Sequence, residues 1–305
     1  MAAGASEDLW REVRIALKRT GDGFADLVSS APDPQAMVTE EWSVADTAAH
    51  LVSICAYYPY LLAGVANPFP TLVDRILSTN VDKVAELNHH VMRELTERDP
   101  RVLAERVRGH IGDILRLSES LDPGHTVTWL GSARLPATGL LAHLVNEFMI
   151  HGWDVARATG ASWPMSRGDA GLFFDLFLTD LIRHGTGSLL DTGEPPHPRR
   201  IAVEFRSRHT RPAMLVLRNG TLTVEEPGPG ADVRIRFDPV ALNLMLFGRL
   251  SRVRAALTGK IVITGRRPWL LPAFLRKVRL PANSYPAPAG PGELGSETSL
   301  AEAGA

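Results

Sequence analysis

LLAHLVNEFMIHGWDVARATG, residues 140–160, is the stretch around which the rest of the chain can be organised. Its apolar residues recur at helical spacing, which predicts one helix with an apolar inner face. Glu147 and His151 belong to that face, and residues four apart on a helix lie one above the other. A carboxylate and an imidazole there must be paired or liganded. The spacing alone fits either a plain Glu–His pair or two ligands of one metal ion.

A second stretch, EWSVADTAAHL at residues 41–51, bears on that choice. Ser43 and Asp46 form an S-x-x-D pattern typical of a capping box, so a helix is expected to begin here and to run to about Gly64. His50 then lies on the inner face, with apolar residues one turn away on either side. A second imidazole among apolar residues favours a metal site over a surface pair.

Composition narrows the class of protein. A length of 305 residues is a soft indication of about two domains. The net charge of −1 argues against general electrostatic binding of nucleic acid or of an anionic membrane, so small molecules are the expected partners. A single cysteine, Cys55, excludes an intrachain disulfide and suits a reducing compartment. With no secretory pattern and no apolar run of membrane-spanning length, we expect a cytoplasmic protein, either a monomer or a homodimer.

Residues 1–185 show helical periodicity and no strand pattern, which favours an up-and-down helical bundle. The pattern predicts a helix beginning at Ser6, the helix after Ser43, one long helix over residues 72–95 and another over residues 102–117. Residues 122–138 are predicted to be a loop, with Thr138 as the N-cap of the central helix. A last helix is expected over residues 171–184.

The pattern changes after a Gly/Pro-rich linker at residues 186–200. Residues 201–280 predict a small α+β domain, because strand-length apolar runs alternate there with helical segments. Asn219–Gly220, between two such runs, is a strong hairpin signal. Asp238–Pro239 is expected to open a helix. Residues 281–305 are predicted to form a disordered tail. The fold class expected is therefore a two-domain α+β protein.

The two stretches together resemble the DinB-like superfamily, in particular the mycothiol-dependent maleylpyruvate isomerase family. The matching residues are WSVADTAAHL, residues 42–51, and NEFMIHGWDVARATG, residues 146–160. The resemblance implies a helical bundle that binds a divalent metal through His50, Glu147 and His151. Residues 231–250 and 257–265 are similar to the sterol-carrier-like domain often joined to this bundle.

Two imidazoles and one carboxylate are a usual set for a catalytic zinc, which keeps one position open. A coordinated thiol ionises, so the expected chemistry is activation of a low-molecular-weight thiol, mycothiol by resemblance, as a thiolate. The thiolate would attack an electrophile, giving cis–trans isomerisation or S-transfer. Nickel, iron or manganese also suits these ligands. His143, one turn before Glu147, is a competing ligand.

Other residues are candidates for binding the thiol or the substrate. Arg249 lies in LFGRL, similar to the W-L-x-G-R stretch whose arginine the family associates with the acidic substrate; the tryptophan is absent here, which leaves the substrate open. Asp154 and Arg157 could support the metal site or bind a ligand, or form a surface pair. Asn80 and Asn88 could bind a sugar-bearing thiol, or could lie on exposed helix positions.

Two other functions remain open on the sequence. One is a non-catalytic module that holds a metal or a lipid. The other is a metal-dependent hydrolase, in which bound water attacks. An open coordination position in a cleft would favour an enzyme, and a requirement for a thiol would separate the proposed transferase or isomerase from a hydrolase.

Overall fold

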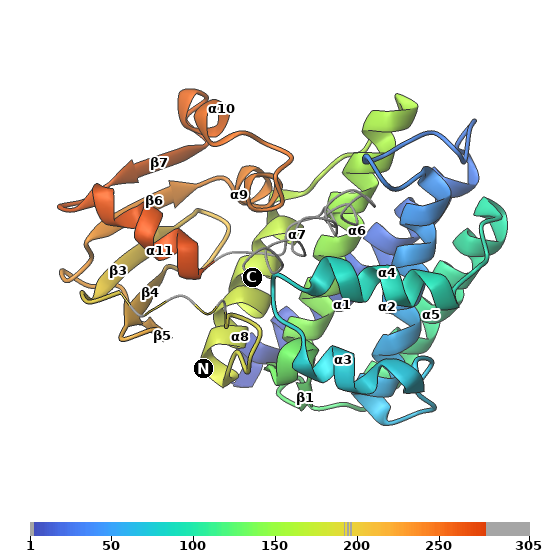
Figure 1. Ribbon diagram of the computed structural model, residues 1–305, viewed down its shortest axis with the longest axis horizontal. Helices are drawn as coiled ribbons and strands as arrows, with labels where there is room; N and C mark the ends of the chain where they lie inside the picture. The colour runs from blue at the N-terminus through green and yellow to red at the C-terminus, as the bar shows by residue number, and fades with distance from the viewer. Residues whose placement is uncertain (1–2, 192, 194, 196, 279–305) are drawn as a thin grey trace, which may run out of the picture.

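The computed structural model describes residues 3–278 apart from 192, 194 and 196. A helical region and a β-sheet region lie side by side, and the chain passes from the first to the second near residue 200 (Figure 1). This confirms the prediction of a helical N-terminal part and a C-terminal part with strands. The division into separate domains stays a prediction, because one continuous hydrophobic cluster includes residues of both regions.

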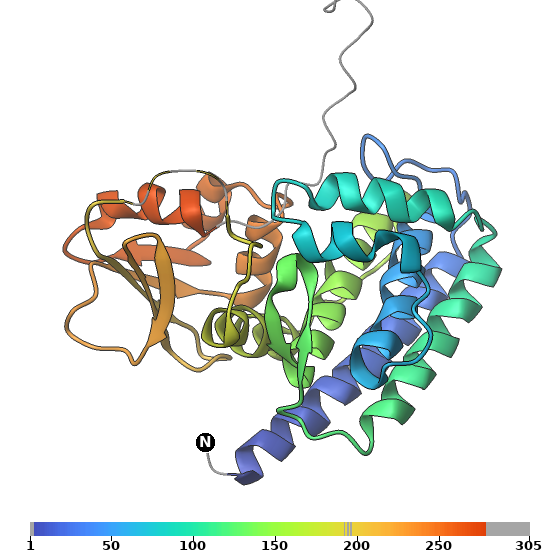
Figure 2. The same cartoon turned by 60° about the horizontal axis from the view of Figure 1, so that its bottom comes forward.

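Four long helices pack side by side and form the body of the helical region (Figure 2). They are α1 (Ala3–Ser29), α2 (Val44–Ala63), α5 (Pro100–Ser118) and α6 (Ala137–Thr159). The helix α1 begins before Ser6 and continues through Gly21, where an added Cβ atom would overlap the Cδ1 atom of Ile111. Glycine therefore allows α1 and α5 to approach closely.

The long helix predicted over residues 72–95 is wrong. The structure has a short 3₁₀ turn, η1 (Pro70–Leu72), followed by α3 (Val73–Ser78) and α4 (Val84–Glu94). Thr79 is extended, and the side chain of Asn80 accepts a 3.1 Å hydrogen bond from the backbone N–H of Asp82. Such a side-chain turn competes with helical hydrogen bonding, so the apolar periodicity continues across a break in the backbone.

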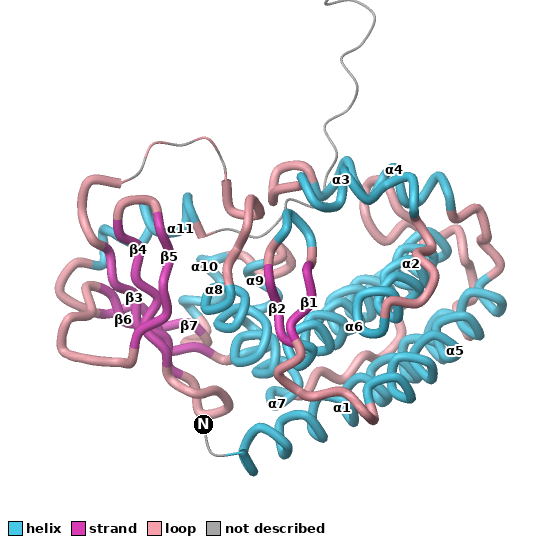
Figure 3. Tube along the Cα trace, turned by 90° about the horizontal axis from the view of Figure 1, so that it is seen from below, coloured by secondary structure: helices cyan, strands magenta, loops and turns pink. Residues whose placement is uncertain are grey.

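The segment at residues 122–138 also differs from its prediction as a loop. It contains two short antiparallel strands, β1 (Thr126–Thr128) and β2 (Arg134–Pro136), connected by the turn η2 (Leu130–Ser132). Figure 3 shows this hairpin beside α6 and apart from the larger sheet. Strands of three residues are too short for alternation to be recognised in the sequence.

The predicted cap of the central helix is wrong as well. Pro136 occupies the N-cap position of α6, and Thr138 lies inside the helix. The backbone N–H of Ala137 donates to the carbonyl of His125 at 2.8 Å, and that of Thr138 donates to Pro123 at 3.3 Å. The preceding loop therefore satisfies the first N–H groups of α6, and a side-chain cap is not needed.

The last helical stretch starts earlier than predicted. It consists of α7 (Arg167–Leu172), a π-helical segment η3 (Phe173–Leu178) and α8 (Thr179–His184). Ser166 caps it by accepting from the backbone N–H of Asp169. The π-helical segment packs against α6, and the ring of Phe174 contacts the rings of Phe205 and Phe237, at 5.3 and 5.2 Å between ring centroids. This segment therefore joins the two regions.

The sheet has the strand order β5-β4-β3-β6-β7, in which β3 and β6 are parallel and the other neighbours are antiparallel. Its strands are β3 (Ile201–Arg206), β4 (Ala213–Arg218), β5 (Thr221–Glu225), β6 (Val233–Phe237) and β7 (Ile261–Thr264). Asn219 and Gly220, with φ of 50° and 79°, form the predicted turn between β4 and β5.

The C-terminal region also contains three helices and one 3₁₀ turn. The three helices are labelled beside the sheet in Figure 1. These elements are α9 (Pro239–Leu246), α10 (Arg252–Leu257), η4 (Pro268–Leu270) and α11 (Leu271–Lys277). Asp238 caps α9 as predicted by accepting from the backbone N–H of Ala241. In the predicted linker, Leu189 and Leu190 are buried, and the carbonyl of Leu189 accepts from the backbone N–H of Val81 at 2.9 Å. The predicted disordered tail, residues 281–305, lies outside the described residues.

None of the described helices combines the length and the apolar composition that crossing a membrane requires.

Candidate metal centre

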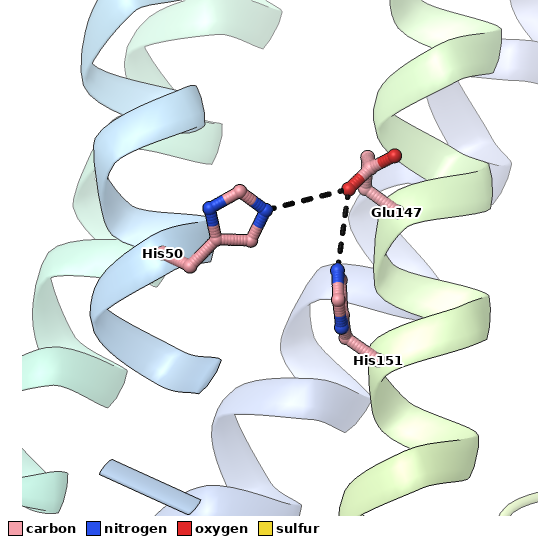
Figure 4. Close-up of side chains that lie close together, drawn as sticks. All are labelled: His50, Glu147 and His151. Carbon is pink, nitrogen blue, oxygen red and sulfur yellow. Dashed lines mark ion pairs between the residues drawn. The ribbon is translucent and has the colours of Figure 1, made fainter. Parts of the chain in front are cut away.

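Two helices bring His50, Glu147 and His151 together (Figure 4). The Nε2 atom of His50 lies 3.7 Å from the Oε2 atom of Glu147, and the Nε2 atom of His151 lies 3.4 Å from the same oxygen. One ligand atom from each residue lies within 4.8 Å of the other two. Four ligands at zinc bond lengths stand about 3.3 Å apart in a tetrahedron. The spacing therefore fits one small divalent cation.

Burial and neighbouring charges set the protonation states of these side chains. All three are largely buried. Burial lowers the pKa of His50 and so keeps its imidazole neutral. Burial alone would raise the pKa of Glu147, but the imidazoles of His143, His151 and His50 hold it well below its usual value. An ionised carboxylate beside a neutral imidazole is the state that binds a metal.

His151 is the exception in its protonation. Burial alone would lower its pKa, but the carboxylates of Asp154 and Glu147 raise it to about 8. Without a cation, the charge of a buried carboxylate is thus balanced by a proton on His151. A cation bound by these residues would take over that role, and the proton on His151 would be released.

His143 lies on the other side of the carboxylate. Its Nε2 atom is 3.4 Å from Oε1 of Glu147, whereas His50 and His151 face Oε2. Its Nδ1 atom is 2.7 Å from the hydroxyl of Tyr58, which is fully buried. This geometry favours His50 over His143 as the third ligand, and it gives His143 and Tyr58 the role of holding Glu147 in position.

Asp154 and Arg249 form a second arrangement, next to His151. The Nε and Nη2 atoms of Arg249 donate to both carboxylate oxygens of Asp154, at 2.5–3.2 Å, and the side chains are only 9% and 3% exposed. Oδ2 of Asp154 lies 3.6 Å from Nδ1 of His151, which is an electrostatic contact rather than a direct hydrogen bond. The arginine of the sheet region therefore reaches a residue that contacts a candidate ligand.

The other predicted binding residues are placed differently. Asn88 lines a cavity that reaches the candidate ligands. Asn80 lies in the turn before α4 and donates from Nδ2 to the carbonyl of Asp191 at 2.9 Å. Arg157 donates to the carbonyl of Val38 at 3.2 Å. Neither Asn80 nor Arg157 is among the described residues that line this cavity, and their role in binding a cofactor stays a prediction.

The cavity has a volume of about 590 Å³ and opens onto the three candidate ligands. Sequence reasoning missed several residues at this end. Trp42 packs its ring 4.7 Å from that of His50, and Trp129 packs 4.8 Å from His143, both measured between ring centroids. Trp42 lies in the same sequence stretch as His50, so its place near the candidate site could have been predicted. Trp129 lies 14 positions before His143 in a segment without periodicity, and nothing in the sequence marks it.

Comparison with known proteins places the helical region in a family. Residues 13–156 match the model of the mycothiol maleylpyruvate isomerase N-terminal domain. The helical region of this chain belongs to that family. The match includes all three candidate ligands and Asp154 and ends before the sheet, so the sterol-carrier-like assignment of the second region stays a prediction.

Solved structures give more distant likenesses. The crystal structure of the mycothiol-dependent maleylpyruvate isomerase is 15% identical, covers 83% of this chain and 92% of its own, and has a TM-score of 0.42. A histidine-to-alanine mutant of it gives 14%, the same coverage and 0.41. A stereoselective inverting sec-alkylsulfatase from Pseudomonas sp. is 16% identical over 76% of this chain and 33% of its own, with a TM-score of 0.27. No protein of curated function matches the sequence.

Proposed function

We propose that this protein is a metal-dependent enzyme that activates mycothiol, or another low-molecular-weight thiol, and uses it for cis–trans isomerisation of an electrophilic substrate or for S-transfer to it. The observation that carries the proposal is the cluster of His50, Glu147 and His151 at one end of a large cavity. Membership of the helical region in the isomerase domain family supports the same chemistry.

A divalent cation, for which we propose zinc, would supply Lewis acidity and lower the pKa of a thiol bound to it. The chain itself fixes the ligands. His143 and Tyr58 hold Glu147 from one side, and Asp154 with Arg249 supports His151 from the other. Three protein ligands leave a position for an incoming sulfur.

The attacking thiol must come from outside the protein. Cys55 is the only cysteine of the sequence, it is fully buried, and burial raises the pKa of its thiol far above neutrality. It is also not among the described residues that line the cavity. A free small thiol is therefore the nucleophile that the site can use.

Isomerisation and S-transfer share a first step. The sulfur adds to a carbon conjugated with an electron-withdrawing group, and the carbon–carbon double bond becomes a single bond that can rotate. If the sulfur then leaves, the thiol is recovered and the substrate has changed geometry. If another group departs with the bonding electrons, the sulfur stays on the product. Recovery of free thiol after turnover therefore separates the two reactions.

The test combines metal analysis with turnover. We expect the full chain to bind about one divalent ion and to convert an activated cis-alkene only when both metal and thiol are present. His50→Ala, Glu147→Gln and His151→Ala should each lose the ion and the activity. His125→Ala, at an exposed position, is the matched control and should keep both.

Other outcomes would contradict the proposal. Full metal content in the Glu147→Gln variant would remove the centre on which it rests. Turnover without a thiol would select a hydrolase. Tight metal binding without turnover of any thiol-reactive substrate would favour a non-catalytic module.

A further inference from the structure

The cavity extends well beyond the candidate metal centre. Its lining runs from His50 and His151 past the aromatic residues of η3 to the inner face of the sheet. All five strands contribute, through Phe205, Leu215, Leu222, Ile235, Ile261 and Ile263. The helix α11 adds Leu271 and Phe274. The two regions of the chain therefore enclose one continuous space, with the metal centre at one end.

One end of the cavity is lined by polar side chains and the other by apolar ones. Every described lining residue from the five strands and from α11 is apolar. The ionisable side chains of the lining come from the helical region and from the segments around α9 and α10: the candidate ligands and His143, together with Glu41, His89, Arg249 and Arg252, Tyr57 and Tyr58. A molecule that fills the cavity is thus recognised by a polar head and an apolar body.

An apolar space of this size needs an occupant. Protein interiors are close-packed, with few voids larger than a water molecule. A volume of about 590 Å³ lies within the range of roughly 300–1,000 Å³ that is typical of small-molecule sites. Water gains few hydrogen bonds against leucine, isoleucine and phenylalanine side chains. Burial of a hydrocarbon group there is favourable by about 25 cal/mol for each Å² removed from water.

Charge argues against a small diacid as that occupant. The cavity is lined by two arginines, and the guanidinium of Arg249 is already bound through two of its nitrogens to the carboxylate of Asp154. Arg252 lies on the exposed side of α10. A molecule with two carboxylates would therefore meet one exposed arginine and a largely apolar wall.

We infer that the substrate is an electrophile with an extended alkyl or aryl body, which lies against the inner face of the sheet while its reactive carbon lies at the metal centre. This inference rests on the proposed function for the reaction, but the apolar site itself can be tested without turnover. The sheet region is then the part of the enzyme that selects the substrate.

Two neighbouring residues of β7 provide a matched pair for the test. Ile263 lines the cavity and is 45% exposed, whereas Val262 is 38% exposed and is not part of the lining. Successive side chains of a strand point to opposite faces. Ile263→Asp places a short carboxylate in the apolar end, and Val262→Asp places the same group on the other face. Both positions are exposed enough for the fold to be retained, which circular dichroism and thermal unfolding check.

The probe is N-phenyl-1-naphthylamine, a neutral apolar molecule that fluoresces when it leaves water. We expect saturable binding of one probe per chain, weakened by at least about tenfold in Ile263→Asp because a carboxylate would have to be desolvated. Val262→Asp should bind within about twofold of the wild type. Absence of saturable binding, or equal loss in both variants, would overturn the inference.

The metal-free variant keeps this test independent of the proposed reaction. Glu147→Gln should bind the probe as the wild type does, even though it loses the metal. In the wild type, kcat/KM for the thiol-dependent isomerisation of N-alkylmaleamates, activated cis-alkenes whose alkyl chain is lengthened stepwise, should rise by up to about fourfold for each methylene that becomes fully buried. If kcat/KM did not change with chain length while the probe still bound, the apolar site would not bind the substrate. That result would contradict the inferred substrate class but not the proposed metal-dependent reaction.

Discussion

At the scale of single residues, the candidate metal centre depends on side chains that support the candidate ligands. Glu147 is shared: one oxygen faces His50 and His151, and the other faces His143. Such supporting contacts fix the orientation of ligands and tune their basicity. The helix position of Glu147 could be read from the sequence, but which oxygen faces which histidine is a product of packing.

Asp154 is expected to matter for metal affinity. In Asp154→Asn the carboxylate beside His151 is lost, and the affinity for zinc should fall by about 10- to 100-fold, as is typical when a supporting carboxylate is removed. A competition titration with a chromophoric chelator measures this. Arg157→Gln, one turn further along α6 and outside the cavity lining, is the control and should leave the affinity unchanged. An unaltered affinity in Asp154→Asn would show that His151 needs no such support.

Tyr58 should contribute to stability through His143. Tyr58→Phe removes the hydroxyl that lies 2.7 Å from Nδ1 of His143 and leaves a buried nitrogen without its partner. The expected loss is on the order of 1–3 kcal/mol in the free energy of unfolding. Urea denaturation measures it, and Tyr60→Phe, at a half-buried position of the same helix, is the comparison. Equal stability of both variants would contradict the assigned contact.

At the scale of elements, the helices that carry the ligands are set by local signals. The capping box is present as predicted: Ser43 accepts from the backbone N–H of Asp46, and Asp46 accepts from that of Ser43. The helix α2 ends at Gly64 in a left-handed conformation. Interactions within three or four residues are encoded by neighbouring side chains, and for this reason α2 could be predicted to within a residue.

The capping box gives a prediction for this element. Ser43→Ala should lower the free energy of unfolding by about 1 kcal/mol, because a backbone N–H at the start of α2 loses its acceptor. Thermal unfolding of the metal-free protein measures it. Ser78→Ala, where the hydroxyl donates back to the carbonyl of Asp74 in an exposed turn of α3, should change stability by much less. A similar effect at both positions would count against the cap.

At the scale of the whole molecule, Asp175 connects the helical region to the sheet. Both of its carboxylate oxygens accept from the backbone N–H of Arg211, at 3.0 Å, just before β4. Its burial raises the pKa of this carboxyl to about 6, against which the Arg211 contacts act only in part. Because the folded pKa lies above the unfolded value, the folded state binds the proton more tightly. Stability from this group is present at low pH and is lost as the pH rises through about 6.

Asp175→Asn isolates that contribution. The free energy of unfolding of the wild type, relative to the variant, should fall by up to roughly 3 kcal/mol between pH 4 and pH 7. Denaturation at a series of pH values measures the difference, and Asp180→Asn, on the same helical stretch with a side chain paired to Arg183, is the comparison. A difference that is flat or rises with pH would contradict the assignment.

The sequence by itself determined what depends on neighbours along the chain. The helix stretch with Glu147 and His151, the capping box before His50 and the Asn219–Gly220 turn were all readable, because one or two turns of backbone contain the signal. The break at Asn80 and the short strands β1 and β2 were not, since three- or four-residue features carry too little periodicity.

Only the tertiary structure decided which distant side chains meet. Arg249 reaches Asp154 across 95 positions, and Tyr58 reaches His143 across 85. The cavity needs the inner face of the sheet and the helices at the same place. These contacts depend on the angles and distances at which whole elements pack, and no local pattern of residues specifies them.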